Sequence, residues 1–166
     1  HATSSYNVRY QDTGYFLEKY VAKDAYHGDT GASDCAFGNN IRYYRYAETL
    51  LNAAELVIAG YGTGESEKWL NEVHQRAIPG EKIEATLENI KTERHLEFVG
   101  EGKRYFDLVR WGDAAKVLVA EDDENFTVAS DKGRMGNWTE AHKYLPIPLS
   151  EIDASNNTLK QNPAYL

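Results

Sequence analysis

The sequence has 166 residues, 42% of them hydrophobic and 27% charged, a composition typical of one soluble globular domain with its own core. Its formal net charge of −8 argues against nucleic acid or an anionic membrane surface as a partner. The single cysteine, Cys35, excludes an internal disulfide framework and a zinc site built from several cysteines.

The chain opens on a polar stretch, HATSSYNVRYQDTGY, which has neither the basic region nor the apolar region of a signal peptide. It does not begin with methionine. We therefore expect a processed chain or a fragment of a longer protein. The apolar runs are too short to span a bilayer. Residues 1–40 are expected to be mostly irregular, because 27–40 are rich in Gly, Asp, Asn and Ser.

Two helices are predicted next. In RYYRYAETLLNAAELVIAG (42–60), apolar residues recur at helical spacing and the helix is expected to end at the final glycine. The predicted packing stripe comprises Tyr44, Ala47, Leu51, Ala54 and Ile58. SEKWLNEVHQRA (66–77) predicts a second helix, which Pro79-Gly80 stops. A tight turn between two such helices is typical of a tetratricopeptide-type hairpin, about one repeat long.

A third helix is predicted to start near Thr86 and to break at Gly100 and Gly102. One face of it is expected to carry Leu87, Ile90, Arg94, Phe98 and Glu101. A short fourth helix is predicted from Lys103 to Gly112, with helical structure continuing through 114–120.

The C-terminal part is predicted to be loop and extended chain. Residues 121–125 (EDDEN) and 130–138 are acidic or glycine-rich, and proline is excluded from helix interiors, so YLPIPLSEI and the QNP tail should be extended. Ile147 and Tyr165 are expected to be buried anchors. The fold class is therefore mainly α, in a single domain 1–166: irregular 1–40, a helical core of about 41–120, and a loop and extended tail 121–166.

The stretch EFVGEGKRYFDLVRW (97–111) mixes charges with large apolar side chains. Its carboxylates lie close in sequence to arginines, which would keep them ionised and unsuited to proton transfer near neutrality. Arginine suits a desolvated ion pair because its planar fork binds two carboxylate oxygens. We therefore expect a structural ion-pair network rather than a catalytic acid or base. Its predicted members are Glu48, Glu55, Arg94, Glu97, Glu101, Arg104, Asp107 and Arg110. The last three are expected to be largely buried and bonded to Glu97, Glu101 or the first predicted helix.

Other site types have weaker support in the sequence. His74, His95, Glu97 and Asp107 lack the spacing of a metal motif, and no metal or other cofactor is predicted. EDDEN lacks the pattern of a calcium loop and is more simply a solvated acidic segment. No nucleophile-elbow motif is present, and no catalytic residue is predicted.

Trp138, in a polar, glycine-rich segment, is the aromatic residue of most interest. With Asn137 beside it, an exposed ring there would suit stacking against a sugar. The alternative, which we favour, is that Trp138 caps the C-terminal core.

Five segments together resemble the C-terminal part of the SusD/RagB family: IRYYRYAETLLNAAEL, LNEVHQRA, IKTERHLEFVGEGKRYFDLVRW, YLPIPLSEI and QNPAY. They lie in the family's order and cover about residues 41–165. His95 stands where the family has a second arginine, Gly100 where it has a large apolar residue, and Ala164 where it has glycine. These departures leave the predicted charge network intact and affect only the expected helix geometry near Gly100.

The resemblance implies a SusD-like fold and no catalysis. Family members are lipoproteins on the bacterial outer-membrane surface that bind oligosaccharides, or in some branches peptides. They work with a SusC-like TonB-dependent transporter that imports the ligand. The family's lipid anchor would lie outside this sequence, and the expected partners are the oligosaccharide, the transporter and the upstream part of the same chain.

Two other functions remain open at this point. The chain could be a structural or interaction scaffold that contacts no ligand itself. It could also belong to a carbohydrate-active enzyme, which a reducing-sugar assay would reveal.

Overall fold

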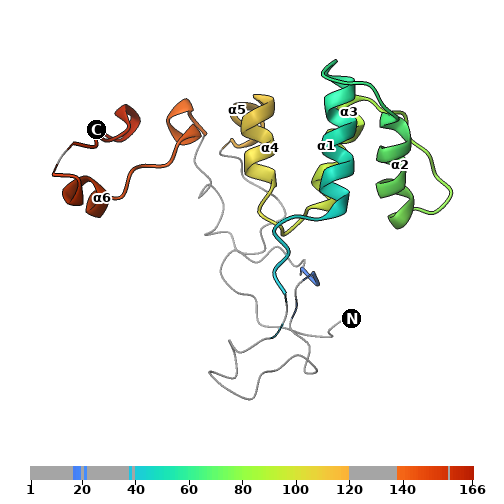
Figure 1. Cartoon of the computed structure of the whole chain (residues 1–166), viewed down its shortest axis with the longest axis horizontal. Coiled ribbons are helices and arrows are strands. Elements are labelled where there is room, and N and C mark those ends of the chain that lie inside the picture. Colours follow the sequence, from blue (N-terminus) through green and yellow to red (C-terminus); the bar gives the residue numbers. More distant parts are fainter. Residues whose placement is uncertain (1–16, 20, 22–37, 39, 120–137, 157) are drawn as a thin grey trace. The chain divides into compact units, whose positions relative to one another are not determined.

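The computed structural model describes residues 17–19, 21, 38, 40–119, 138–156 and 158–166. They fall within two compact units, Leu17–Arg104 and Tyr105–Leu166, which are treated separately below. All regular elements among the described residues are helical (Figure 1). The predicted mainly α fold class is thus confirmed. Among the described residues, no helix is both long and apolar enough to cross a membrane.

The first unit is built on the predicted hairpin. Helix α1 spans Tyr46–Ile58 and α2 spans Ser66–Ala77, the latter with the predicted bounds. Between them Gly60 adopts φ +81°, a left-handed conformation that glycine accepts at little cost. The facing sides of the two helices bury Leu51 and Leu70 completely.

Helix α1 begins later than the sequence predicts. Arg45 precedes it with an extended backbone (φ −132°, ψ 156°), so Tyr44 lies outside the helix and is exposed. Ile58, at the other end of the predicted stripe, is also exposed. The apolar period therefore identified the helix correctly but assigned both of these residues to its packed face wrongly.

Helix α3, Leu87–Glu97, closes the core against the hairpin. Thr86 caps its start by accepting a hydrogen bond from the backbone N–H of Asn89, 3.2 Å away. The core of this unit comprises Leu50, Leu51, Ala54, Leu70, Val73, Ile90 and Phe98. Leu87, which was expected on the packed face, is instead 43% exposed, because it lies in the first turn of α3.

The second unit holds shorter helices. Helix α4 spans Arg104–Trp111, starting at the last residue of the first unit, and α5 spans Ala114–Val117. Gly112, at φ +75°, separates them, so the predicted helical continuation exists as a distinct one-turn helix. Leu108 and Ala114 are the buried apolar residues here.

The C-terminal segment is more helical than expected. A 3₁₀ turn (η3) spans Glu140–Lys143, α6 spans Leu149–Ala154, and a second 3₁₀ turn (η4) spans Pro163–Tyr165. Residues 145–148 lie outside any helix, and Pro148 has an extended backbone (φ −53°, ψ 138°), but the following LSEI lies inside α6, where an extended chain was expected.

The two expected anchors of this segment are half-buried rather than buried. Hydrogen bonds hold them instead. The Ile147 N–H and C=O each bond to the Gln161 side chain at 2.9 Å, and the Tyr165 hydroxyl donates to the Tyr144 carbonyl at 2.9 Å. The prediction of burial is therefore wrong. Hydrogen bonds hold this short segment in place without removing the two side chains fully from water.

Candidate functional site

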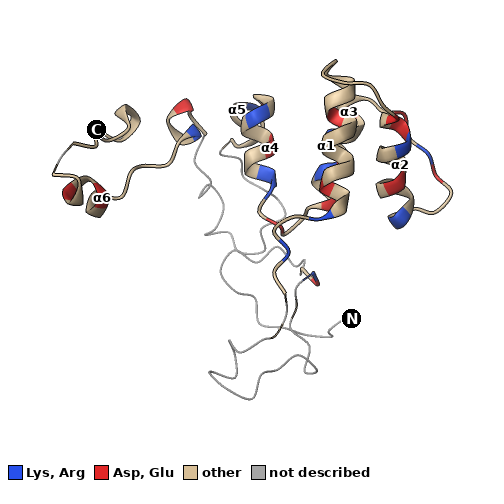
Figure 2. Cartoon of the chain, viewed as in Figure 1, with Lys and Arg blue, Asp and Glu red and all other residues tan. Residues whose placement is uncertain are grey.

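The densest polar cluster of the first unit lies at the C-terminal end of α3. Helices α2 and α3 each carry both acidic and basic residues, whereas α1 carries acidic residues and follows directly after Arg45 (Figure 2). Arg45 donates to both carboxylate oxygens of Glu101, from Nε at 2.9 Å and from Nη2 at 2.7 Å. Its third nitrogen, Nη1, donates to Glu97 Oε1 at 2.7 Å. The planar guanidinium thus binds two carboxylates that are both almost fully removed from solvent.

Two further cations complete this cluster. Lys19 Nζ lies 2.6 Å from Glu101 Oε1 and 2.8 Å from the carbonyl oxygen of Glu97. Arg76 of α2 binds the second carboxylate oxygen of Glu97. Glu97 and Glu101, both predicted members of the network, therefore lie together here. Their partners Arg45, Lys19 and Arg76 were not predicted.

Electrostatics keeps this cluster ionised. Burial would raise the pKa of Glu101, but hydrogen bonds from Arg45 and Lys19 outweigh it and hold that pKa below its usual value. The hydrogen bond to Glu101 in turn raises the pKa of Arg45. A carboxylate held in this way is a poor general acid or base near neutrality.

Two arginines contact the ring of Phe98. The guanidinium carbon atoms of Arg45 and Arg94 lie over the ring, 5.2 and 5.1 Å from its centroid. Arg94 is buried and donates to Asn52 Oδ1 at 2.6 Å, with Glu48 at 4.0 Å. The predicted members Arg94 and Glu48 therefore lie close together, in contact with α1.

The remaining predicted members are distributed differently. Arg110 Nε donates to Asp107 at 2.9 Å and stacks over Trp111 at 4.5 Å. Asp107 is buried, but Arg110 is exposed and Arg104 is half-buried, although both were expected inside. An exposed arginine costs less desolvation, and its stem can still cover apolar surface. Glu55 is half-buried on α1.

A buried histidine–carboxylate pair, which no motif in the sequence predicts, joins α2 to α3. His74 Nδ1 lies 2.8 Å from Glu93 Oε2, and both side chains are buried. Glu81 lies 4.0 Å from the other ring nitrogen, Nε2. Lone histidines on helices are usually solvated, so only the tertiary packing of α2 on α3 reveals this pair.

Trp138 belongs to the second unit and is half-buried. Its backbone N–H donates to the Leu118 carbonyl at 2.8 Å, and its indole Nε1 lies 3.4 Å from the Tyr105 hydroxyl. Tyr105 in turn donates to the His142 carbonyl. Trp138 is thus held within its own unit by its backbone bond to Leu118 and by its ring bond to Tyr105. Asn137, its predicted companion, lies outside the described residues, as does the acidic segment 121–125.

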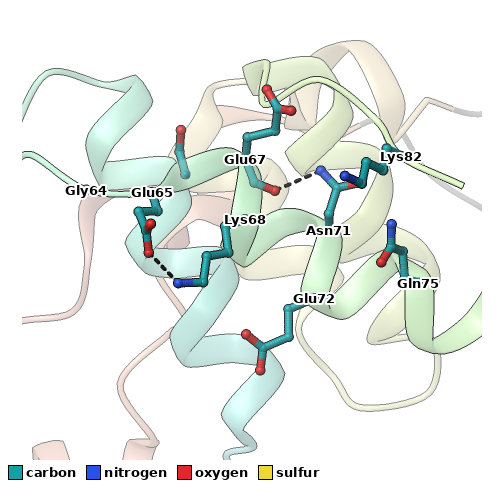
Figure 3. A pocket seen from close by; sticks show the side chains of 9 residues that line it. Gly64, Glu65, Glu67, Lys68, Asn71, Glu72, Gln75 and Lys82 are labelled. Atoms are coloured by element: carbon teal, nitrogen blue, oxygen red, sulfur yellow. Dashed lines mark hydrogen bonds and ion pairs between the residues drawn. The ribbon is translucent and has the colours of Figure 1, made fainter. Parts of the chain in front are cut away.

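One open pocket of about 730 Å³ lies along the outer side of α2 (Figure 3). Its lining is Gly64, Glu65, Ser66, Glu67, Lys68, Asn71, Glu72, Gln75 and Lys82. Lys68 is paired with Glu65 at 2.6 Å, and the Asn71 amide is occupied by the Glu67 and Ile83 backbone. This lining has no aromatic ring on which a sugar could stack. No cluster of three metal-ligating side chains occurs among the described residues.

Comparison with known proteins assigns a family to these features. The sequence profile of the SusD family matches residues 1–165. A curated relative, SusD-like protein P25 of Formosa agariphila, is 30% identical over 131 residues, which is 69% of this chain and 24% of the relative.

Solved structures are more similar still. Surface glycan-binding protein A from Bacteroides thetaiotaomicron is 54% identical, with a TM-score of 0.82 over 96% of this chain and 32% of its own length. That protein is also solved in complex with laminarihexaose. A laminarin-binding SusD-like protein is 34% identical, with a TM-score of 0.74, over 96% of this chain and 31% of its own. The chain thus spans about a third of the length of the solved relatives it matches.

Proposed function

Because this chain belongs to the SusD family, we propose that the protein that carries it captures oligosaccharides at the outer-membrane surface and delivers them to a TonB-dependent transporter. The observation that carries the proposal is the 54% identity to surface glycan-binding protein A of Bacteroides thetaiotaomicron. That relative is solved in complex with laminarihexaose, and another solved relative is a laminarin-binding SusD-like protein, so these glycans are the first ligands to test.

The expected chemistry of capture is stacking and hydrogen bonding. Neutral sugars offer no charge, so aromatic faces and amide, hydroxyl and arginine groups would have to supply the contacts. An array of individually weak contacts predicts a dissociation constant between about 1 μM and 1 mM, or roughly −8 to −4 kcal/mol.

The proposal assigns no catalysis to this protein. The carboxylates of the α3 cluster are locked by arginine and lysine, which opposes proton transfer. The ion-pair residues would therefore serve the fold. A reducing-sugar assay on laminarin should detect no product beyond the uncatalysed background.

The proposed location is the surface of the outer membrane. The proposed partners are a SusC-like transporter and the remainder of a longer chain, within which residues 1–166 would form one C-terminal domain. Affinity purification of the full-length protein from detergent-solubilised outer membranes should recover the transporter in stoichiometric amount.

The deciding experiment is calorimetric titration of the full-length protein with laminarihexaose. Maltohexaose, which has the same sugar units in a different linkage, is the matched control. Saturable binding of laminarihexaose alone supports a laminarin-type ligand. Binding of maltohexaose alone moves the proposal to another glycan.

Two alternatives have their own outcomes in the same design. Binding of a peptide library in place of every glycan would indicate a peptide-capturing member of the family. Co-purification with the transporter and no ligand binding would indicate a scaffold. In that design, Trp138 and Asn137 stay candidate ligand contacts, to be separated from structural roles by substitution.

A further inference from the structure

Tyr44 combines exposure with a fixed position. The residue retains 58% of its accessible surface at the entry to α1. Its hydroxyl oxygen nevertheless lies 3.3 Å from Thr49 Oγ1 and 3.4 Å from Asn52 Nδ2, each of which can donate to it. Lys103 Nζ lies over the ring, 5.8 Å from the centroid. The side chain is thus held from both its ring and its hydroxyl end.

The groups that hold Tyr44 are themselves fixed by buried charges. The buried Arg94 donates to Asn52 Oδ1 at 2.6 Å, which turns the amide nitrogen toward the tyrosine. Lys103 is held by Glu48 at 3.0 Å and by the Tyr43 carbonyl at 2.6 Å. Since Glu48 is buried, both supports of the ring are connected to the interior of the first unit.

Another exposed tyrosine provides a contrast. Tyr61, in the turn after α1, is 82% exposed, and the described residues provide no side-chain hydrogen bond or ring contact to it. Its conformational freedom would be lost upon binding a ligand, at a cost that a fixed ring does not incur. Of these two rings, Tyr44 is therefore the one already ordered for an incoming partner.

The polar surroundings indicate the ligand class. The Tyr44 hydroxyl accepts from two donors, which leaves its own O–H to donate, and the Lys103 ammonium has one N–H beyond those directed to Glu48 and the Tyr43 carbonyl. The positive charge of Lys103 is neutralised by the Glu48 carboxylate, so the surface around Tyr44 favours a neutral ligand. The exposed Tyr44 ring can contact a flat apolar face, and the donors beside it can bind hydroxyl groups. A hexose ring has a flat apolar face and hydroxyl groups at its edge.

We propose that Tyr44, with Lys103 beside it, forms a stacking subsite for one sugar ring of a neutral oligosaccharide. This inference rests on the proposed glycan-binding function and adds a location to it. It differs from the Trp138 hypothesis, because the Trp138 ring is half-buried and its N–H groups are directed to its own unit.

The test titrates the full-length protein with laminarihexaose, comparing wild type with Tyr44→Ala, Tyr44→Phe and the control Tyr61→Ala. Tyr44→Ala should weaken binding about tenfold, since it removes the stacking surface. Tyr44→Phe keeps that surface and should stay within about threefold of wild type. Tyr61→Ala should bind as wild type does. Thermal unfolding of each variant is measured in parallel.

The outcomes separate this inference from the proposed function. Unchanged affinity in Tyr44→Ala, with wild type binding normally, overturns the subsite and leaves glycan capture standing. A lowered melting temperature with unchanged affinity overturns it as well, because the ring would then be packing against another part of the protein. If Tyr44→Ala fails to fold, Tyr44→Leu keeps apolar bulk without a flat ring and should show the same loss of affinity. Absence of any glycan binding by wild type removes both proposals.

Discussion

Arg45 and Glu97 join the residue before α1 to the last residue of α3. Arg45 Nη1 lies 2.7 Å from Glu97 Oε1, across 52 positions of sequence. The same guanidinium grips Glu101, so one side chain fixes where α1 begins and where the chain goes after α3.

Replacing Arg45 by alanine should therefore destabilise the first unit strongly. The buried carboxylates of Glu97 and Glu101 would each lose a partner. Among the described residues, Arg76 would remain paired with Glu97 and Lys19 with Glu101. We expect a loss of about 3 kcal/mol in the free energy of unfolding, measured with denaturant.

The matched control is Lys68→Ala. Lys68 pairs with Glu65 at 2.6 Å on the exposed side of α2, where solvent screens the interaction. Its removal should leave stability nearly unchanged. Equal effects of the two substitutions would show that the Arg45 cluster is solvated, against this interpretation.

Acid should weaken the same cluster through Glu101. Its pKa in the folded protein lies below the usual 4.5, so the folded state holds the proton less tightly than the unfolded state. The stabilisation is therefore complete above about pH 5 and is lost as the pH falls through the folded pKa. The free energy of unfolding of Glu101→Gln, measured from pH 6 to pH 3, should decline less steeply than that of wild type. The control is Glu88→Gln, on the exposed side of α3, which should follow wild type. Parallel curves for all three proteins would refute the linkage.

Two left-handed glycines offer a comparison after α3. Gly100 (φ +77°) and Gly102 (φ +72°) would both be strained by alanine, at about 1–2 kcal/mol each. A Cβ on Gly102 meets open space, whereas one on Gly100 collides with the Leu17 side chain. Gly100→Ala should therefore cost more in chemical denaturation. When Gly100→Ala is made in a Leu17→Ala protein and compared with Leu17→Ala alone, its cost should fall to that of Gly102→Ala. Additive effects in this double-mutant cycle would mean that Leu17 does not lie there.

Asn71 should be essential to the connection between α2 and α3. Its side chain accepts from the Ile83 N–H at 2.8 Å and donates to the Ile83 and Glu67 carbonyls at 2.8 and 2.7 Å. Asn71→Ala removes the side-chain partner of the N–H and C=O groups of the half-buried Ile83, so we expect a loss of about 1–2 kcal/mol by denaturant unfolding. Asn71→Asp cannot donate and should not restore stability. Gln75→Ala removes only a bond to Glu81 and is the mild control; a comparable loss there would contradict the assignment.

Trp138 can be assigned by measuring stability and binding together. Because its indole and backbone are tied within the second unit, Trp138→Ala should lower the free energy of unfolding by about 2 kcal/mol, less than for a fully buried ring. Trp138→Phe should recover most of this. A variant that melts like wild type but binds laminarihexaose less tightly would instead identify Trp138 as a ligand contact.

The helices could be predicted from the sequence because their apolar residues recur with the helical period. The start of α1 could not, since Tyr44 fits that period equally well. What excludes it is the extended backbone of Arg45, which brings the guanidinium to carboxylates more than fifty positions away. Spacing rules detect pairs of charges on one helix. They could not predict the ion pairs of Glu97, because its partners Arg45 and Arg76 lie outside α3. The buried His74–Glu93 pair was missed for the same reason.

The stacking of two guanidinium groups on Phe98 has a spectroscopic consequence. Protons above the face of an aromatic ring are shielded by its ring current, and both Arg45 and Arg94 lie over this ring. Their side-chain resonances should appear upfield of those of arginines that lie over no aromatic ring. Loss of the upfield shift for Arg45 alone would report release of the N-terminal end of α1 while Arg94 stays in place, so the state of the cluster can be followed without altering a residue.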